Sequence, residues 1–228
     1  MHGAFGNPPY FHIGCDEADP PSCANCRARP YAETVFAHIE EIRSLLEQRG
    51  ATAMMWHDML LDKADPRWTG FTKYGDAETA RLGTMLSRKM LMCDWEYGKP
   101  YGGREGAKDY PTSDYLKGLG FDVVMCPWHR PADIDDANAG AVAQADYVRA
   151  HGLRGVLQTV WHHYRGQDFA RMMETSSCAV WNGDIRATGW SATAFRTHWR
   201  QVGWDAGVRE FEETGYFDRQ VTRDILDE

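Results

Sequence analysis

Phe11-His-Ile-Gly-Cys-Asp-Glu17 is a short apolar run that ends on two adjacent carboxylates. Successive side chains of a regular strand point to opposite faces. Asp16 and Glu17 can therefore share one pocket only if the backbone leaves strand geometry at that point. Such a change is expected at the carboxyl end of a parallel strand, the edge where parallel α/β proteins place their chemistry. The stretch predicts a strand that ends at an active site equipped for acid-assisted bond cleavage.

Five short apolar runs recur along the chain, each bounded by polar residues, Gly or Pro. This pattern is typical of strands buried on both faces of a parallel sheet, and helix-like segments lie between the runs. The alternation predicts right-handed βαβ units in a parallel sheet or barrel. The expected strands are 11–14, 51–56, 90–95, 121–128 and 155–161. The expected helices are 31–49, 76–86, 113–119, 137–151 and 167–180.

Tryptophan recurs at the ends of the expected strands. Four of them end in Trp and the remaining one is followed by Asp16-Glu17. Since the carboxyl ends of parallel strands meet at one edge, the indoles and the carboxylates are expected to surround a common pocket. Such an aromatic box suits a pyranose ring, whose C–H faces stack on indole. The alternative is four unrelated core tryptophans, and the repeated position favours the pocket. The tryptophans concerned are Trp56, Trp95, Trp128 and Trp161.

Composition limits the classes of function. The chain has 228 residues, 43% of them hydrophobic, which is typical of a globular protein with one sizeable core. The net charge of −8, without a basic block, argues against nucleic acid as a partner. No apolar stretch approaches the roughly 18 residues that a membrane span requires. No secretory leader follows Met1, and this favours a cytoplasmic location.

Six cysteines raise the question of metal or disulfides. Of these, Cys23-Ala-Asn-Cys26 has ligand-like spacing, and Cys15 could supply a third ligand. A structural zinc site needs about four ligands, and the sequence offers no second close pair. Free thiols or a local disulfide are therefore favoured over a metal, and we expect neither metal nor cofactor.

At these residues the chain resembles glycoside hydrolase family 20, the β-N-acetylhexosaminidases, and most of all their small bacterial and hexosaminidase-D-like members. The family carries a His-x-Gly-(Gly/x)-Asp-Glu motif after its fourth barrel strand, and here the motif reads His12-Ile-Gly-Cys-Asp16-Glu17. Met55-Trp-His-Asp58 is similar to the fifth-strand tryptophan segment. Cys93-Asp-Trp95 and Thr159-Val-Trp161 resemble the sixth- and eighth-strand tryptophans. The resemblance covers roughly residues 8 to 185.

The resemblance implies hydrolysis of terminal β-linked N-acetylhexosamine with retention of configuration. Glu17 would protonate the departing oxygen, and Asp16 would hold the substrate's 2-acetamido group while its carbonyl attacks C1. Tyr97 or Tyr164 would replace the tyrosine that donates to that carbonyl, and His163 falls where many members bind outer sugar hydroxyls. The indole box would comprise Trp56, Trp95 and Trp161, with Trp128 as a further substrate-binding candidate. The alternative is a non-catalytic sugar-binding fragment or relic of such an enzyme.

The resemblance also implies an incomplete fold. The chain contains strands matching the fourth to the eighth of a (β/α)8 TIM barrel, so we expect a partial barrel over residues 1–185 and a C-terminal helical extension over 186–228. The first three strands have no counterpart. We favour truncation, with a missing N-terminal segment, over completion by a second chain or a non-barrel sheet. The expected partner is a small glycan or glycoconjugate substrate. His57-Asp58 either orients the acid pair or forms a strand-end ion pair.

Overall fold

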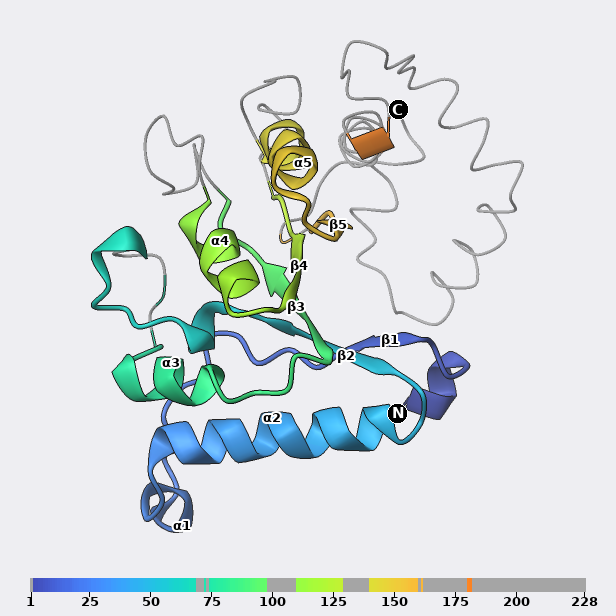
Figure 1. Ribbon diagram of the computed structural model, residues 1–228. Helices are drawn as coiled ribbons and strands as arrows, with labels where there is room; N and C mark the ends of the chain where they lie inside the picture. Colours follow the sequence, from blue (N-terminus) through green and yellow to red (C-terminus); the bar gives the residue numbers. More distant parts are fainter. Residues whose placement is uncertain are drawn as a thin grey trace, which may run out of the picture.

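The computed structural model describes residues 2–68, 72, 74–97, 110–128, 140–159, 161 and 180–181 (Figure 1). Within these residues, five parallel strands form one sheet whose spatial order follows the chain order. The strands are β1 (Tyr10–His12), β2 (Thr52–Trp56), β3 (Met90–Asp94), β4 (Asp122–Met125) and β5 (Gly155–Val156).

The connections between the strands contain helices. Together the strands and helices form a curled half-barrel of consecutive βα units, in agreement with the predicted partial α/β barrel. The helices are α1 (Ala24–Arg27), α2 (Tyr31–Glu47), α3 (Ala77–Gly83), α4 (Pro111–Gly118) and α5 (Gly140–His151). Short 3₁₀ turns are η1 (His2–Phe5), η2 (Asp58–Leu60) and η3 (Pro66–Trp68).

The expected strands coincide with the observed ones, although most are shorter at their carboxyl ends. The ladder of β4, for example, ends at Met125, and the next three residues continue as irregular backbone. The expected helix 167–180 lies outside the described residues except at its last position. The boundary at residue 185 and the extension 186–228 lie outside them entirely. The match of these strands to the fourth through eighth barrel strands stays a prediction.

Local signals explain where the helices begin. Asp76 precedes α3, and its carboxylate accepts hydrogen bonds from the backbone N–H groups of Glu78 (3.0 Å) and Thr79 (2.9 Å). The Thr79 hydroxyl in turn accepts from the Asp76 N–H, which completes a capping box. Helix α4 starts at Pro111, a residue that suits the first helical turn because that turn has no use for its missing N–H.

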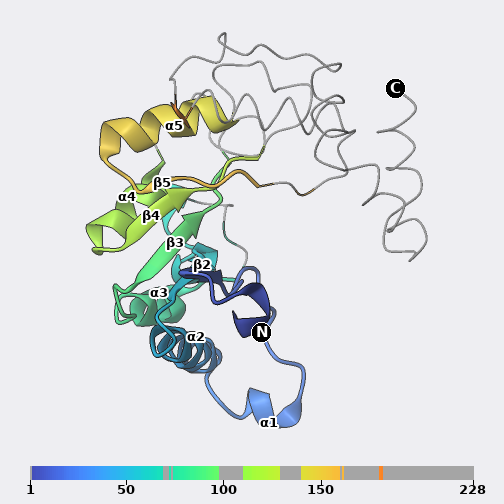
Figure 2. The same ribbon diagram turned by 90° about the vertical axis from the view of Figure 1, so that its right-hand side faces the viewer.

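The two faces of the sheet bury different sets of residues, because side chains alternate along each strand. One face packs against the helices, and Figure 2 shows α2 to α5 along that face. Its core includes Ile39 of α2 and Leu116 of α4, each at most 1% exposed, with Met55, Met92 and Val123 from the strands. The opposite face carries Leu91, Cys93, Val124 and Cys126, with Met54, Trp56 and Trp95 packed against them. The indoles thus belong to the concave face.

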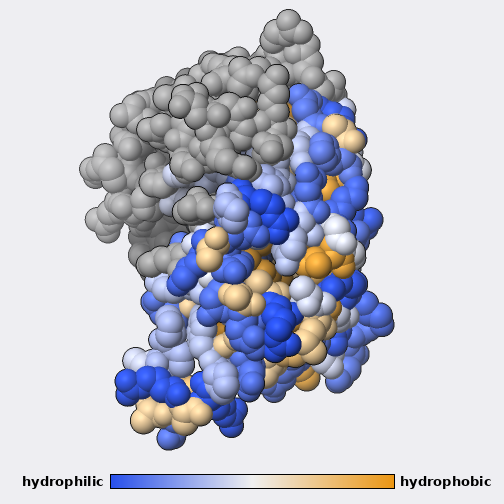
Figure 3. Space-filling model, turned by 60° about the vertical axis from the view of Figure 1, so that its left-hand side comes forward, coloured by the Kyte–Doolittle hydropathy of each residue, from blue (hydrophilic) through white to orange (hydrophobic). Residues whose placement is uncertain are grey.

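The outer surface combines polar residues with small apolar areas. Figure 3 shows one side of the molecule, on which hydrophilic residues surround small hydrophobic patches. Within the described part of the chain, none of the helices has the length and apolar character to cross a membrane.

Candidate active site

The backbone leaves strand geometry between β1 and the acid pair, as the sequence requires. Gly14, Cys15 and Glu17 all have positive φ, at 74°, 68° and 39°. For residues other than glycine the left-handed region costs about 1–2 kcal/mol, so two such residues in a stretch of four mark a backbone held by its surroundings. Pairing with β2 continues through the turn, because the Trp56 N–H donates to the Gly14 carbonyl at 3.0 Å. The turn brings both Asp16 and Glu17 to one cavity.

This cavity has a volume of about 220 Å³ and lies at the carboxyl ends of the strands. Its lining consists of Asp16, Glu17, Trp56, Trp95, Tyr97, Trp128 and Trp161. Seven of the eight site residues expected from the sequence therefore surround one hollow. The eighth, His163, lies outside the described residues, as does Tyr164. The structure brings the seven together, and their individual roles remain predictions.

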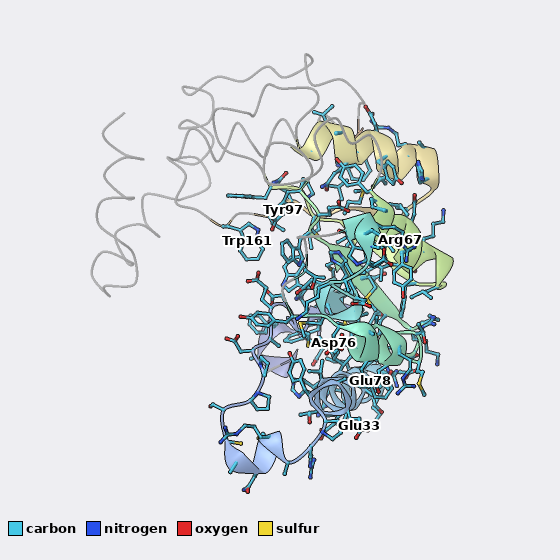
Figure 4. All side chains as sticks on the ribbon, turned by 90° about the vertical axis from the view of Figure 1, so that its left-hand side faces the viewer. Glu33, Arg67, Asp76, Glu78, Tyr97 and Trp161 are labelled. Carbon is cyan, nitrogen blue, oxygen red and sulfur yellow. The ribbon has the colours of Figure 1, made fainter. Side chains whose placement is uncertain are left out.

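The aromatic residues form a continuous wall. Ring centroids are 5.7 Å apart for Trp56 and Trp161, 5.6 Å for Trp95 and Tyr97, and 5.4 Å for Tyr97 and Trp128. The Trp161 indole N–H donates to the Tyr97 hydroxyl, and Figure 4 shows these two side chains next to each other. Such tilted pairs add about 0.5–1.5 kcal/mol each beyond simple burial. The wall presents apolar ring surface to the cavity beside the two carboxylates.

The Tyr97 phenol is suited to donate a hydrogen bond. Burial raises its pKa above the usual value, and the negative charge of Asp16 adds to the effect, although hydrogen bonding with Trp161 and Thr159 opposes it. A phenol with a raised pKa keeps its proton at neutral pH. Tyr97 therefore offers an O–H group at the wall of the cavity.

Asp58 links the acid pair to the aromatic wall. Its side chain is fully buried; one carboxylate oxygen accepts from the Glu17 backbone N–H at 3.0 Å and the other from the Trp95 indole N–H at 3.1 Å. Burial raises the pKa of Asp58, while these two hydrogen bonds and the neighbouring His57 oppose the rise. Of the two alternatives for His57-Asp58, the contacts of Asp58 favour orientation of the acid pair.

A second buried network lies behind the wall. His57 Nε2 is 3.1 Å from Asp94 Oδ1, and both side chains are fully buried. The other oxygen of Asp94 accepts from the hydroxyls of Thr112 (2.7 Å) and Ser113 (2.5 Å) at the start of α4. Asp94 thus faces the helices while its neighbour Trp95 faces the cavity. The network holds the ends of β2 and β3 against α4.

Sequence reasoning missed Thr112 and Ser113. Thr112 lies 18 residues after Asp94, in an expected loop, and Ser113 lies 19 residues after it, at the start of an expected helix. Hydroxyl residues are common at both kinds of position. The available signal was an acidic residue directly before a strand-end tryptophan. That residue must face away from the pocket and needs polar partners if it is buried.

The fold and the lining define a parallel α/β protein with an aromatic, carboxylate-bearing pocket at its strand ends. No family model matches the sequence, and a search of curated proteins finds no significant match. Among solved structures, the chain is similar to one described as "Crystal structure analysis of Dispersin B", with a TM-score of 0.41 and 14% sequence identity. The similarity covers 83% of this chain and 56% of the other, so the chain spans little more than half of that protein's length.

Proposed function

We propose that this chain is a glycoside hydrolase that removes terminal β-linked N-acetylhexosamine, with Glu17 as the general acid and Asp16 as the residue that orients the 2-acetamido group. The supporting observation is the single cavity lined by two neighbouring carboxylates and five aromatic residues. Carboxyl groups can transfer protons and stabilise developing positive charge. Aromatic rings supply flat apolar surface for the C–H faces of a sugar.

The size of the cavity supports action at a chain end. Pockets for drug-sized ligands commonly measure about 300–1,000 Å³. The cavity, as bounded by the described residues, measures about 220 Å³. It therefore suits one sugar ring rather than several, and we infer that the enzyme takes the terminal residue of a glycan.

The proposed reaction needs no nucleophile from the protein. Glu17 gives its proton to the glycosidic oxygen as the bond to C1 breaks, and the acetamido carbonyl oxygen attacks C1 from within the substrate. Asp16 accepts a hydrogen bond from the acetamido N–H and stabilises the positive charge that develops there. Tyr97 donates its hydroxyl proton in a hydrogen bond to the carbonyl oxygen. Water then attacks C1, with Glu17 as the base, and the configuration is retained.

Glu17→Gln tests the role of the acid. We expect hydrolysis of N,N′-diacetylchitobiose to fall by about 10²–10⁴-fold, the usual contribution of general acid catalysis. Release of p-nitrophenol from its N-acetyl-β-glucosaminide should fall less, because that leaving group departs without full protonation. Asp19→Asn is the matched control, since Asp19 is exposed on the same loop and does not line the cavity. The control should keep wild-type turnover of both substrates.

The acetamido requirement is tested with p-nitrophenyl β-glucoside, which lacks that group. We expect the wild type to cleave it far more slowly than the N-acetyl compound, and Asp16→Asn to reduce this preference. The proposed mechanism would be rejected if wild type and Glu17→Gln hydrolysed N,N′-diacetylchitobiose equally fast. It would also be rejected if the wild type cleaved the N-acetyl-β-glucosaminide and the β-glucoside at equal rates. Calorimetric binding of N-acetylglucosamine without any turnover would instead establish the non-catalytic sugar-binding alternative.

A further inference from the structure

A pair of cysteines that the proposed function does not use lies on the outer loop between the acid pair and α2. Cys23 immediately precedes α1, and Cys26 lies within it. The Cys26 backbone N–H donates to the Cys23 sulfur at 3.1 Å, so the two residues are in direct contact. Both residues are exposed. The two cysteines are therefore in contact, and both thiols are accessible to solutes.

We propose that Cys23 and Cys26 form a redox-active dithiol that exchanges with low-molecular-weight disulfides and closes into an intramolecular disulfide. The ligand class is a soluble disulfide such as oxidised glutathione. The proposal is independent of the glycosidase function, since neither thiol lines the cavity.

The contacts assign different roles to the two sulfurs. The hydrogen bond from the Cys26 side chain lowers the pKa of Cys23, and the backbone N–H of Cys26 acts in the same direction. The same thiol–thiol contact raises the pKa of Cys26, and the nearby Arg29 only partly opposes it. The thiolate is the attacking form in thiol–disulfide exchange. Cys23 is therefore the nucleophile and Cys26 the residue that resolves the mixed disulfide.

The exchange balances in two steps. The Cys23 thiolate attacks one sulfur of the soluble disulfide, the old S–S bond breaks, and one thiolate leaves. The Cys26 thiol then loses its proton and attacks the Cys23 sulfur, which expels the second thiolate. The dithiol has lost two electrons and two protons, and the soluble disulfide has become two thiols.

The other described cysteines lack this combination of contact and access. Burial raises the pKa of Cys15 to about 11, and it raises the pKa of Cys126 as well. Contact with Cys126 lowers the pKa of Cys93 to about 6, but the Cys93 side chain is fully buried among the strands. Within the described part of the chain, no group of three or more His, Cys, Asp or Glu side chains is arranged to hold a metal ion. Two-thiol chemistry is what the geometry of Cys23 and Cys26 supports.

The test uses the full chain, reduced, freed of reductant and incubated with oxidised glutathione. Remaining thiols are then blocked with N-ethylmaleimide, and the protein is cleaved after glutamate. The peptide of residues 18–33 contains Cys23 and Cys26 but not Cys15. We expect the wild-type peptide to be lighter than the reduced form by two hydrogen atoms and to carry no label. Cys26→Ser should lose this disulfide and retain glutathione on Cys23, whereas Cys23→Ser should leave Cys26 mainly labelled.

Cys15→Ser is the control, and its 18–33 peptide should match that of the wild type. Circular dichroism checks that each variant folds, and the exposure of both thiols leads us to expect that it does. Two labels on the wild-type peptide after oxidation, or two glutathione adducts, would overturn the proposal. Stoichiometric zinc that the Cys23→Ser/Cys26→Ser variant loses would also overturn it, because the pair would then be a metal site.

Discussion

Asp58→Asn perturbs the link between the acid pair and the aromatic wall while it conserves the size of the side chain. Asp58 is fully buried, and its two oxygens accept one N–H each, from the Glu17 backbone and the Trp95 indole. Asparagine offers a single oxygen and an NH₂ group. In either orientation, one of the two N–H donors loses its acceptor and faces another donor.

The two energetic terms of this substitution have opposite signs. A buried donor without an acceptor costs about 1–3 kcal/mol. The substitution also removes a carboxylate whose pKa is raised by burial, and this recovers part of the cost. We therefore expect a net loss of about 1–2 kcal/mol in the free energy of unfolding at neutral pH. Asp58→Ala leaves both donors unpaired, so its loss should be about 2–6 kcal/mol.

The pH dependence follows from the direction of the pKa shift. Because the pKa of Asp58 is higher in the folded state than in the unfolded state, the pH-dependent part of its contribution to stability is largest in acid and is lost as the pH rises through the folded pKa. A protonated carboxyl can still accept with both oxygens, unlike the amide. The stability advantage of the wild type over Asp58→Asn should thus grow as the pH is lowered from 7 toward about 4.

Urea unfolding of the wild type and Asp58→Asn at several pH values measures both effects. With an m-value of about 2 kcal/mol/M, the expected loss lowers the midpoint by about 0.5–1 M at pH 7. Asp19→Asn serves as the exposed control and should change stability by less than about 0.5 kcal/mol. If Asp58→Asn has the same urea midpoint as the Asp19→Asn control at every pH, then the Asp58 carboxylate does not hold Glu17 and Trp95.

Two further predictions concern the backbone turn and the helical core. Gly14→Ala places a side chain at φ 74° and should lower the free energy of unfolding by about 1–2 kcal/mol. Gly118 lies in α4 with open space around it, so Gly118→Ala should raise the free energy of unfolding by about 0.4–1 kcal/mol. Ile39 is 1% exposed, so Ile39→Ala leaves a cavity in the core and should lower the free energy of unfolding by about 2–5 kcal/mol. Leu45 on the same helix is 43% exposed, and Leu45→Ala should lower the free energy of unfolding by less than about 1 kcal/mol. Urea midpoints check both pairs. Equal effects of the two glycine substitutions would contradict the left-handed backbone at Gly14, and equal effects of Ile39→Ala and Leu45→Ala would contradict the burial of Ile39.

Much of the fold could be predicted because its signals are local. Apolar runs with polar boundaries located the five strands of the described residues, and the 31–49 pattern located α2, since each element is encoded within a few consecutive residues. The candidate pocket followed from one topological rule. Residues that end parallel strands must meet at one edge, so Trp56, Trp95, Trp128 and Trp161 were expected together and do line one cavity.

For the described part of the chain, the sequence by itself thus determined the strands and helices, their parallel order and which residues gather at the strand ends. Only the tertiary structure decided how those residues are held. The left-handed backbone at Cys15 and Glu17, the two N–H groups on Asp58 and the hydroxyls on Asp94 depend on strand register and on the paths of connecting loops. Each of these contacts joins residues that are 18 to 41 positions apart or requires a strained backbone. No periodicity within a short window encodes such pairings, because they form only when the whole sheet has assembled.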